Sequence, residues 1–253
     1  MIQRPDVPEL DYAATGVAIR DDLRAAHRRL LEHIRAPGTW WTGAERVAIA
    51  AEARRADECA FCRTRKAALS PVAVAGAHDT TGTLPANVVD VVHRIRTDPA
   101  RLSRAWFDAV IAGGLDVAPY VELVAVVTML TGIDYFARAL GIAPVGLPTP
   151  LPGAPSRHVP AGAHPGEAWV PMIAAEDATG PEADIYGTAG AFVPNIVRAL
   201  SFVPAEVRTL WDTSAAHYLP VDQISDPTAR RALDRNQMEL VAARVSALNQ
   251  CFY

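Results

Sequence analysis

Cysteine is scarce in this sequence of 253 residues, which contains only Cys59, Cys62 and Cys251. Three cysteines are too few for a disulfide-stabilised scaffold, and their odd number leaves at least one thiol outside any disulfide within a single chain. In a reducing compartment, two cysteines separated by two residues are more often catalytic or metal-binding than structural. The pair Cys59 and Cys62 is therefore the first candidate for chemistry.

Blocks of positive charge are absent as well, and the formal net charge is −4. A dedicated nucleic-acid surface needs clustered lysine and arginine, so we expect no nucleic-acid partner. The sequence has no uninterrupted apolar run of about 18 residues and no signal-peptide core after Met1, so we expect a soluble, cytoplasmic protein without a membrane partner. Small molecules and other proteins are the expected partners.

Strand patterns are almost missing, because alternation of period two is not sustained anywhere; the sequence predicts an all-α fold. Apolar residues instead recur every three or four positions, as on one face of a helix. Helices are predicted over 17–35, 44–55, 58–69, 88–95, 102–111, 117–141, 181–186, 195–212 and 228–248. The segment 117–141 is the most apolar and is the expected central helix, with Thr131-Gly132 as a candidate break.

The chain is expected to form two helical units, 1–142 and 172–253, joined by the Pro/Gly-rich linker 143–171. The two units also show a short internal similarity. Without gaps, Val121-Glu122-Leu123-Val124-Ala125 aligns with Met238-Glu239-Leu240-Val241-Ala242, and Asp134 then aligns with Cys251. This similarity predicts two related helical units.

Cys59 and Cys62 lie at the start of a predicted helix, for which Asp57 is the expected N-cap. A helix N-terminus supplies unpaired N–H groups and partial positive charge, which stabilise a thiolate. Such a thiolate can attack a hydroperoxide, become a sulfenic acid and be resolved by the neighbouring thiol. Two other interpretations stay open: a pair of buried, inert thiols, and half of a zinc site on which His78 and His93 would have to converge.

Two glutamates are candidate proton acceptors. Glu239 lies twelve residues before Cys251, and a helical turn could fold its carboxylate back toward the sulfur; the alternative is a solvated surface side chain. Glu122 holds the same place in the first unit, on a helix nearly free of charge, and a buried glutamate needs a partner. His93 fits a helix surface or an interface better than a catalytic site, although it remains a candidate base.

The segment Met238–Ala242 followed by Val245–Tyr253 resembles the core of the alkylhydroperoxidase D-like, or carboxymuconolactone decarboxylase, superfamily. Redox members of that family carry Glu, eleven residues, Cys, two residues, Cys, three residues and His on an all-helical fold. Glu239 corresponds to the Glu and Cys251 to the first Cys, whereas the second Cys and the His would follow Tyr253. In the family the second Cys attacks the peroxide and the first resolves it.

The resemblance would make Cys251 a resolving thiol without its partner. Two explanations for an interruption at Tyr253 are a truncation and a UGA codon that is read as selenocysteine.

Cys59-Ala60-Phe61-Cys62 also resembles the family's cysteine pair, but Lys66 stands at the His position and Val47 at the Glu position. Another base would have to serve there, for which the candidates are Glu52, Glu58 and His93.

The resemblance implies an alkylhydroperoxidase D-like fold and a thiol-dependent peroxidase in which Cys62 attacks a hydroperoxide and Cys59 resolves it. It further implies an external dithiol as reductant, a homo-oligomer, and no bound cofactor or metal. Two alternatives remain. One is a degenerate, non-catalytic helical module for oligomerisation or binding. The other is a cofactor-free lyase that works through Glu122 and His93.

Overall fold

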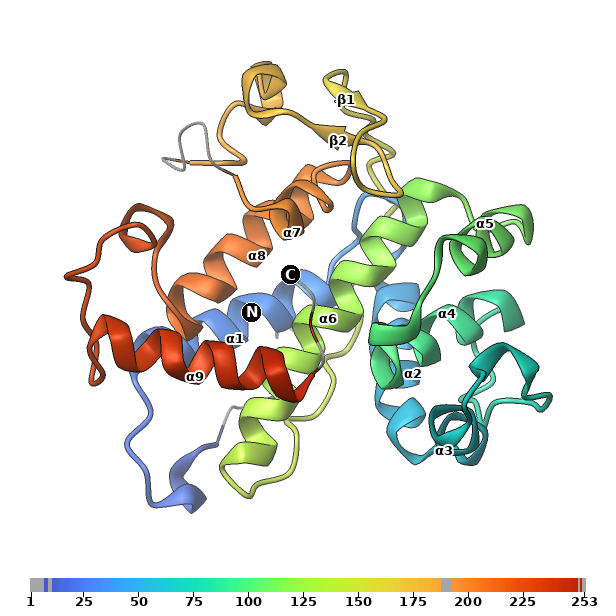
Figure 1. Ribbon diagram of the computed structural model, residues 1–253, viewed down its shortest axis with the longest axis horizontal. Helices are drawn as coiled ribbons and strands as arrows, with labels where there is room; N and C mark the ends of the chain where they lie inside the picture. The colour runs from blue at the N-terminus through green and yellow to red at the C-terminus, as the bar shows by residue number, and fades with distance from the viewer. Residues whose placement is uncertain (1–6, 9–10, 188–192, 250, 252–253) are drawn as a thin grey trace, which may run out of the picture.

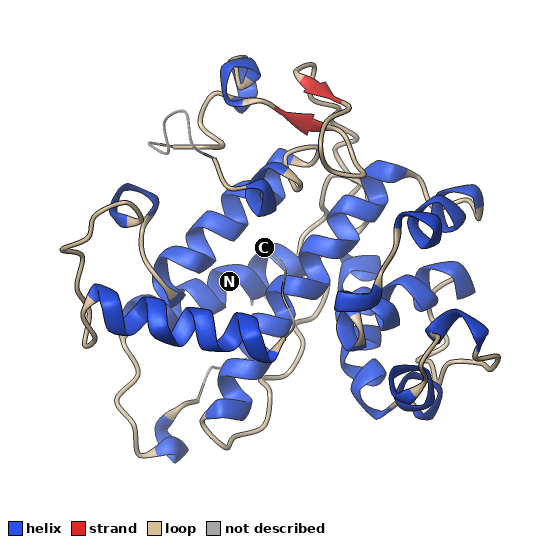
Figure 2. Ribbon diagram, viewed as in Figure 1, coloured by secondary structure: helices blue, strands red, loops and turns tan. Residues whose placement is uncertain are grey.

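The computed structural model describes residues 7–8, 11–187, 193–249 and 251, and it consists mostly of helices (Figures 1 and 2). Among these residues the only strands are β1 (Ala163–His164) and β2 (Met172–Ile173), which pair antiparallel. The predicted all-α fold class is confirmed. The predicted interruption of the Glu-to-Cys motif at Tyr253 lies outside the described residues.

The helices are α1 (Asp21–Arg35), α2 (Gly43–Glu58), α3 (Ala60–Ala67), α4 (Ala86–Thr97), α5 (Arg104–Ala112), α6 (Val117–Ala139), α7 (Asn195–Arg198), α8 (Pro204–His217) and α9 (Arg235–Leu248). Short 3-10 turns are η1 (Ala13–Thr15), η2 (Pro71–Ala73), η3 (Pro99–Arg101), η4 (Ala175–Asp177), η5 (Gly180–Glu182) and η6 (Val221–Gln223).

Local sequence explains where several helices begin and end. Thr42 and Glu45 form a reciprocal capping box at the start of α2, and Asp234 and Gln237 form another at the start of α9. The second capping box starts the last helix later than the predicted residue 228. The predicted helix 195–212 is divided into α7 and α8, because Pro204 lacks the N–H that a continuous helix needs and suits a first turn instead.

The central helix is α6, which crosses the middle of the molecule in Figure 1. It packs against α1, α2, α4 and α8, and its apolar side chains form much of the main hydrophobic core. The predicted break at Thr131-Gly132 is wrong, since α6 continues through both residues. Gly132 lowers the helix propensity of this segment, but the packing of α6 on several sides stabilises the helix by more than that loss.

By length and composition α6 could cross a membrane, but 67% of its most apolar window is buried inside the molecule. A helix that is hydrophobic around most of its circumference is explained by burial in a core. Residues of the two predicted units contribute to that same core: Val207 of α8 and Leu123 of α6 are both fully buried within it.

The segment 143–171 contains no helix, as predicted, and follows an extended path. It is held to the chain after α1 by backbone hydrogen bonds from Leu151 N–H to the Arg35 carbonyl and from Ser156 N–H to the Gly38 carbonyl, at 2.8 and 3.1 Å.

A charged network lies buried between α1, α2, α6 and α8. Arg46 donates to Glu122 at 2.7 Å and to Glu206 at 3.1 Å, and all three side chains are fully buried. His33 reaches Glu206 at 2.9 Å, and the backbone N–H of Trp40 donates to Glu122. The network gives Glu122 the partner that its predicted burial required.

The two carboxylates of this network titrate differently. Burial raises the pKa of Glu122, with Glu206 adding to the effect and Arg46 opposing it. Burial also raises the pKa of Glu206, but His33 and Arg46 outweigh that effect and lower its pKa overall. Glu122 and Glu206 are thus unequal members of one ion network, which joins four helices.

Arg46→Met should destabilise the fold strongly, because it leaves two carboxylates buried without their cation. Breaking a buried ion pair on one side costs about 3–5 kcal/mol. Arg29→Met is the matched control, since Arg29 forms an exposed pair with Asp212 and such pairs contribute at most about 1 kcal/mol. Urea unfolding measures both; equal losses would contradict the assigned role of Arg46.

A second polar contact joins α1 to α8. Tyr12 Oη lies 2.5 Å from His27 Nδ1, and His27 Nε2 lies 2.7 Å from His217 Nε2. If Tyr12 donates, a neutral His27 accepts at Nδ1 and donates through Nε2 to a neutral His217. Burial and, to a smaller extent, repulsion from His217 in its protonated form lower the pKa of His27 to about 4.

Acid should weaken this contact. Because the unfolded chain binds a proton at His27 near pH 6.5 and the folded chain only near pH 4, stability falls as pH decreases through that window. The expected loss between pH 7 and pH 5 is about 2 kcal/mol for this group. His27→Gln should remove that part of the loss in urea unfolding, whereas His164→Gln, at an exposed histidine, should leave it intact.

Candidate functional site

The cysteine pair sits where α2 ends and α3 begins. The predicted N-cap, Asp57, is wrong, because α2 continues to Glu58 and Cys59 itself caps α3. The sulfur of Cys59 accepts from the backbone N–H of Cys62 at 3.4 Å and from that of Asp79 at 3.4 Å. The predicted placement of both thiols at the first turn of a helix is confirmed.

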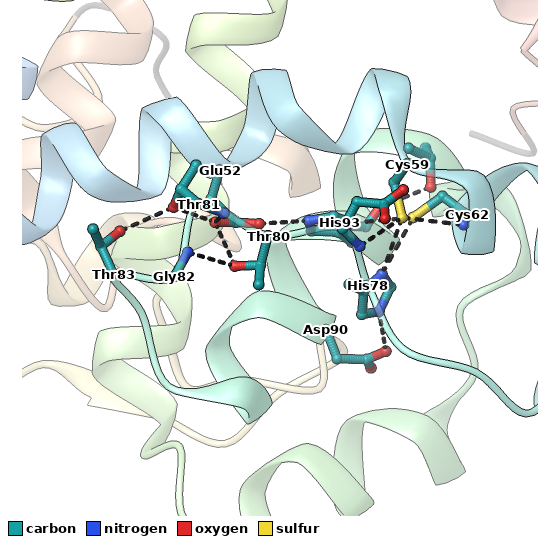
Figure 3. Close-up of polar contacts among 12 residues, drawn as sticks. Glu52, Cys59, Cys62, His78, Thr80, Thr81, Gly82, Thr83, Asp90 and His93 are labelled. Carbon is teal, nitrogen blue, oxygen red and sulfur yellow. Dashed lines mark hydrogen bonds and ion pairs between the residues drawn. The ribbon is translucent and has the colours of Figure 1, made fainter.

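Two histidines converge on this pair (Figure 3). Nδ1 of His93 lies 3.1 Å from Cys62 Sγ. Nδ1 of His78 lies 3.4 Å from Cys62 Sγ and 3.7 Å from Cys59 Sγ. One ligand atom from each of the four side chains lies within 4.8 Å of the others. The convergence that the zinc interpretation required is therefore present.

A carboxylate lies behind each imidazole. Nε2 of His93 is 2.7 Å from Glu52, and Nε2 of His78 is 3.0 Å from Asp90. Asp90 also accepts from Arg65 at 2.8 Å. Because the Nε2 of each ring is hydrogen-bonded to its carboxylate, the Nδ1 of each ring faces Cys62 Sγ.

Hydroxyl and backbone groups of the loop before α4 complete the environment of Glu52. Its Oε2 accepts from the hydroxyl of Thr80 at 3.0 Å and from the hydroxyl and backbone N–H of Thr81 at 2.6 and 2.9 Å. Glu52 thus accepts four hydrogen bonds, including that of His93, and its orientation is well determined.

The helices and the loop bring these groups together for identifiable reasons. Asp90 and His93 lie one turn apart on α4, so they share a face. His78 lies in a loop that is attached to α3, because Asp79 accepts from the backbone N–H of Ala60 at 2.8 Å. The loop passes so close to Phe61 that a Cβ at Gly76 would lie 2.5 Å from the ring.

The cluster favours a thiolate next to a charged imidazole. Burial raises the pKa of Cys59, but hydrogen bonds from the backbone of Cys62 and Asp79 and from His78 outweigh it, so its pKa is lowered. Burial lowers the pKa of His78, but Asp90 and the two sulfurs outweigh it and raise the pKa to about 10.

The second imidazole behaves in the opposite way. Burial lowers the pKa of His93, and the charge of His78 adds to that effect, while Glu52 opposes it. Burial raises the pKa of Glu52, but the hydrogen bonds from Thr81, His93 and Thr80 outweigh it, so its pKa is lowered. The preferred state of this pair is an ionised Glu52 facing a neutral His93.

Two cavities border the cluster. One of about 180 Å³ reaches Cys62, which is 4% exposed, and is lined by Arg63, Lys66 and Arg96 as well as Asp57. The other, of about 460 Å³, borders His78, Arg65 and Asp90. Cys59 is fully buried and lines neither of them. Small molecules therefore approach Cys62 more readily than Cys59.

The structure places the other predicted site residues elsewhere. Glu122 belongs to the network of Arg46. Glu239 accepts a hydrogen bond from the hydroxyl of Tyr218 and pairs with Arg235 at 2.9 Å. Cys251 is exposed beyond the end of α9. Of the predicted catalytic residues, Cys59, Cys62 and His93 come together, and the cluster of four ligand atoms includes neither Glu239 nor Cys251.

Sequence patterns indicated His78 only as a possible zinc ligand and did not indicate Asp79, Asp90 or Thr81. Asp90 and His93 are three residues apart on one predicted helix, and this spacing indicates that they share a face. No family model, curated protein or solved structure matches this chain. The resemblance to the alkylhydroperoxidase D-like superfamily accordingly stays a prediction.

Glu52→Ala should destabilise the protein by about 2–3 kcal/mol, because it leaves His93 and the threonine donors without their acceptor. Glu58→Ala is the matched control on the same helix, since the Glu58 side chain is 76% exposed and changes at such positions stay within about 0.5 kcal/mol. Urea unfolding of both variants at pH 7 measures the difference. A Glu52 variant as stable as the Glu58 variant would contradict the assigned hydrogen bonds.

Proposed function

We propose that this protein is a thiol-dependent, peroxidase-like oxidoreductase that reduces hydroperoxides through Cys59 and Cys62. The observation that carries the proposal is a chain of two hydrogen-bond contacts. Cys62 Sγ lies 3.1 Å from His93 Nδ1, and His93 Nε2 lies 2.7 Å from Glu52 Oε1. This arrangement supplies a base where the family motif would place a histidine and this chain has Lys66. A base oriented by a carboxylate next to a nucleophile is the usual arrangement for activating a thiol.

In the proposed reaction, Nδ1 of His93 takes the proton of the Cys62 thiol. The thiolate attacks the terminal peroxide oxygen, the O–O bond breaks, and the leaving alkoxide takes the proton from Nδ1 of His93 and departs as the alcohol. Cys62 is then a sulfenic acid. Cys59 attacks its sulfur, water leaves, and a disulfide forms. The sum is one hydroperoxide and two thiols giving one alcohol, one water and one disulfide.

Access supports this division of roles. Cys62 borders a cavity and can meet a substrate, whereas the buried Cys59 can meet only an oxidised Cys62. The sulfurs lie within 4.8 Å of each other, and side-chain rotation has to bring them to about 2.05 Å to close the bond. An external dithiol then reduces the disulfide and returns both thiols.

An assembly role has a separate observation in its favour. The helix α9 exposes Leu240, Val241, Val245 and Leu248, each by 50% or more. Contiguous exposed apolar side chains are typical of interaction surfaces. We include a homo-oligomer in the proposal for this reason, and a purely non-catalytic helical module is the second candidate function.

Treatment of the reduced, metal-free protein with a hydroperoxide should link Cys59 to Cys62, as detected by mass spectrometry of peptides. His93→Gln should slow the linkage by about 10²–10⁴-fold, the usual contribution of a general base. His158→Gln is the control, because His158 also pairs with a carboxylate, that of Glu182, but does not belong to the cysteine cluster. This variant should leave the rate unchanged. A protein whose thiols stay reduced would favour the non-catalytic module. A His93 variant that reacts at the normal rate would contradict the role of His93 as the base.

A further inference from the structure

We propose that the reduced protein binds one divalent cation of the zinc class through Cys59 Sγ, Cys62 Sγ, His78 Nδ1 and His93 Nδ1. The proposal goes beyond peroxide reduction, because it assigns a second activity to the same thiols. It also gives a role to His78, a residue that the proposed peroxide reaction does not use.

The distances between the ligand atoms match those of a tetrahedral site. Zinc bonds of about 2.3 Å to sulfur and 2.0–2.1 Å to nitrogen place a sulfur and a nitrogen about 3.5 Å apart at tetrahedral angles. The three close sulfur–nitrogen distances here are 3.1, 3.4 and 3.7 Å. These three distances are close to the tetrahedral value, and the other pairs of ligand atoms also lie within 4.8 Å of one another.

The surroundings of the two histidines also match those of metal ligands. Metal-binding histidines usually donate their second N–H to a carboxylate or carbonyl, which orients the ring. Glu52 and Asp90 occupy those places, at 2.7 and 3.0 Å. The two histidines come from different elements, and each has its Nδ1 within 3.4 Å of Cys62 Sγ. The carboxylate at each Nε2 completes the outer shell of the site.

Charge and burial favour the same ion. Two thiolates neutralise a doubly charged cation. The cation displaces the Nδ1 proton of His78, so both imidazoles bind as neutral ligands and complete the four-coordinate set. The backbone N–H groups of Cys62 and Asp79 point at the sulfur of Cys59. With four protein ligands no position is left for water, so the site would hold the metal without using it for hydrolysis.

Metal binding and peroxide reduction would exclude each other. A disulfide brings the sulfurs to about 2.05 Å, which removes both thiolate ligands. A hydroperoxide that oxidises the pair should thus release the ion.

The test uses the full chain, reduced and stripped of metal with a chelator. Titration with Zn²⁺ against a chromophoric chelator should show one tight equivalent, and Co²⁺ should give the visible bands of a tetrahedral site with thiolate charge transfer. Cys59→Ser and His78→Asn should lose both signals. Asp90→Asn should weaken binding by about 10–100-fold. Cys251→Ser and His164→Asn are the matched controls and should bind as the wild type does.

His78→Cys guards against a trivial loss through misfolding, because it keeps four ligands and should strengthen the Co²⁺–thiolate charge-transfer band. Absence of a stoichiometric Zn²⁺ equivalent in the wild type, or unchanged binding in both Cys59→Ser and His78→Asn, would overturn the proposal. Disulfide formation in the metal-free wild type after peroxide treatment is measured in a separate experiment. Failure of metal binding and failure of the redox function therefore give different results.

Discussion

The hydrogen bond between His93 and Glu52 is the interaction on which the site depends. It joins α4 to α2 in the interior, where both side chains are fully buried. A buried glutamate needs donors and a buried imidazole needs a partner for each nitrogen. Nε2 of His93 donates to Glu52, which satisfies both buried groups, and this hydrogen bond directs Nδ1 of His93 at Cys62. The same hydrogen bond thus fixes how α2 packs against α4 and how the imidazole of His93 is oriented.

The helix α2 connects this site to the rest of the core. Its Glu52 faces the cysteine cluster, while its Arg46 faces the carboxylates of α6 and α8. Polar groups buried in this way specify one arrangement of neighbours, because any other arrangement would leave charges unpaired. Arg46 therefore links helices from both ends of the chain, and Glu52 stands on the scaffold that results.

The cluster combines features of two kinds of chemistry. A thiol beside a base is suited to attack on a peroxide, and two thiols with two carboxylate-backed histidines are suited to a zinc-class ion. The proposed reaction and the proposed metal site share three ligand side chains, Cys59, Cys62 and His93, because both require thiolates and an oriented imidazole. The difference lies in His78: it completes a metal site, while the proposed peroxide reaction needs only Cys59, Cys62 and the His93–Glu52 pair.

The sequence by itself determined the all-α class, the apolar central helix and the position of the cysteine pair at a helix start, because these follow from local periodicity and capping. It also named Glu52 and His93 as candidate bases without pairing them. Only the tertiary structure decided that His78 reaches the thiols and that Arg46 meets Glu122. Those contacts depend on how a loop crosses Phe61 and how distant helices pack, and no periodic pattern along the chain encodes either of them.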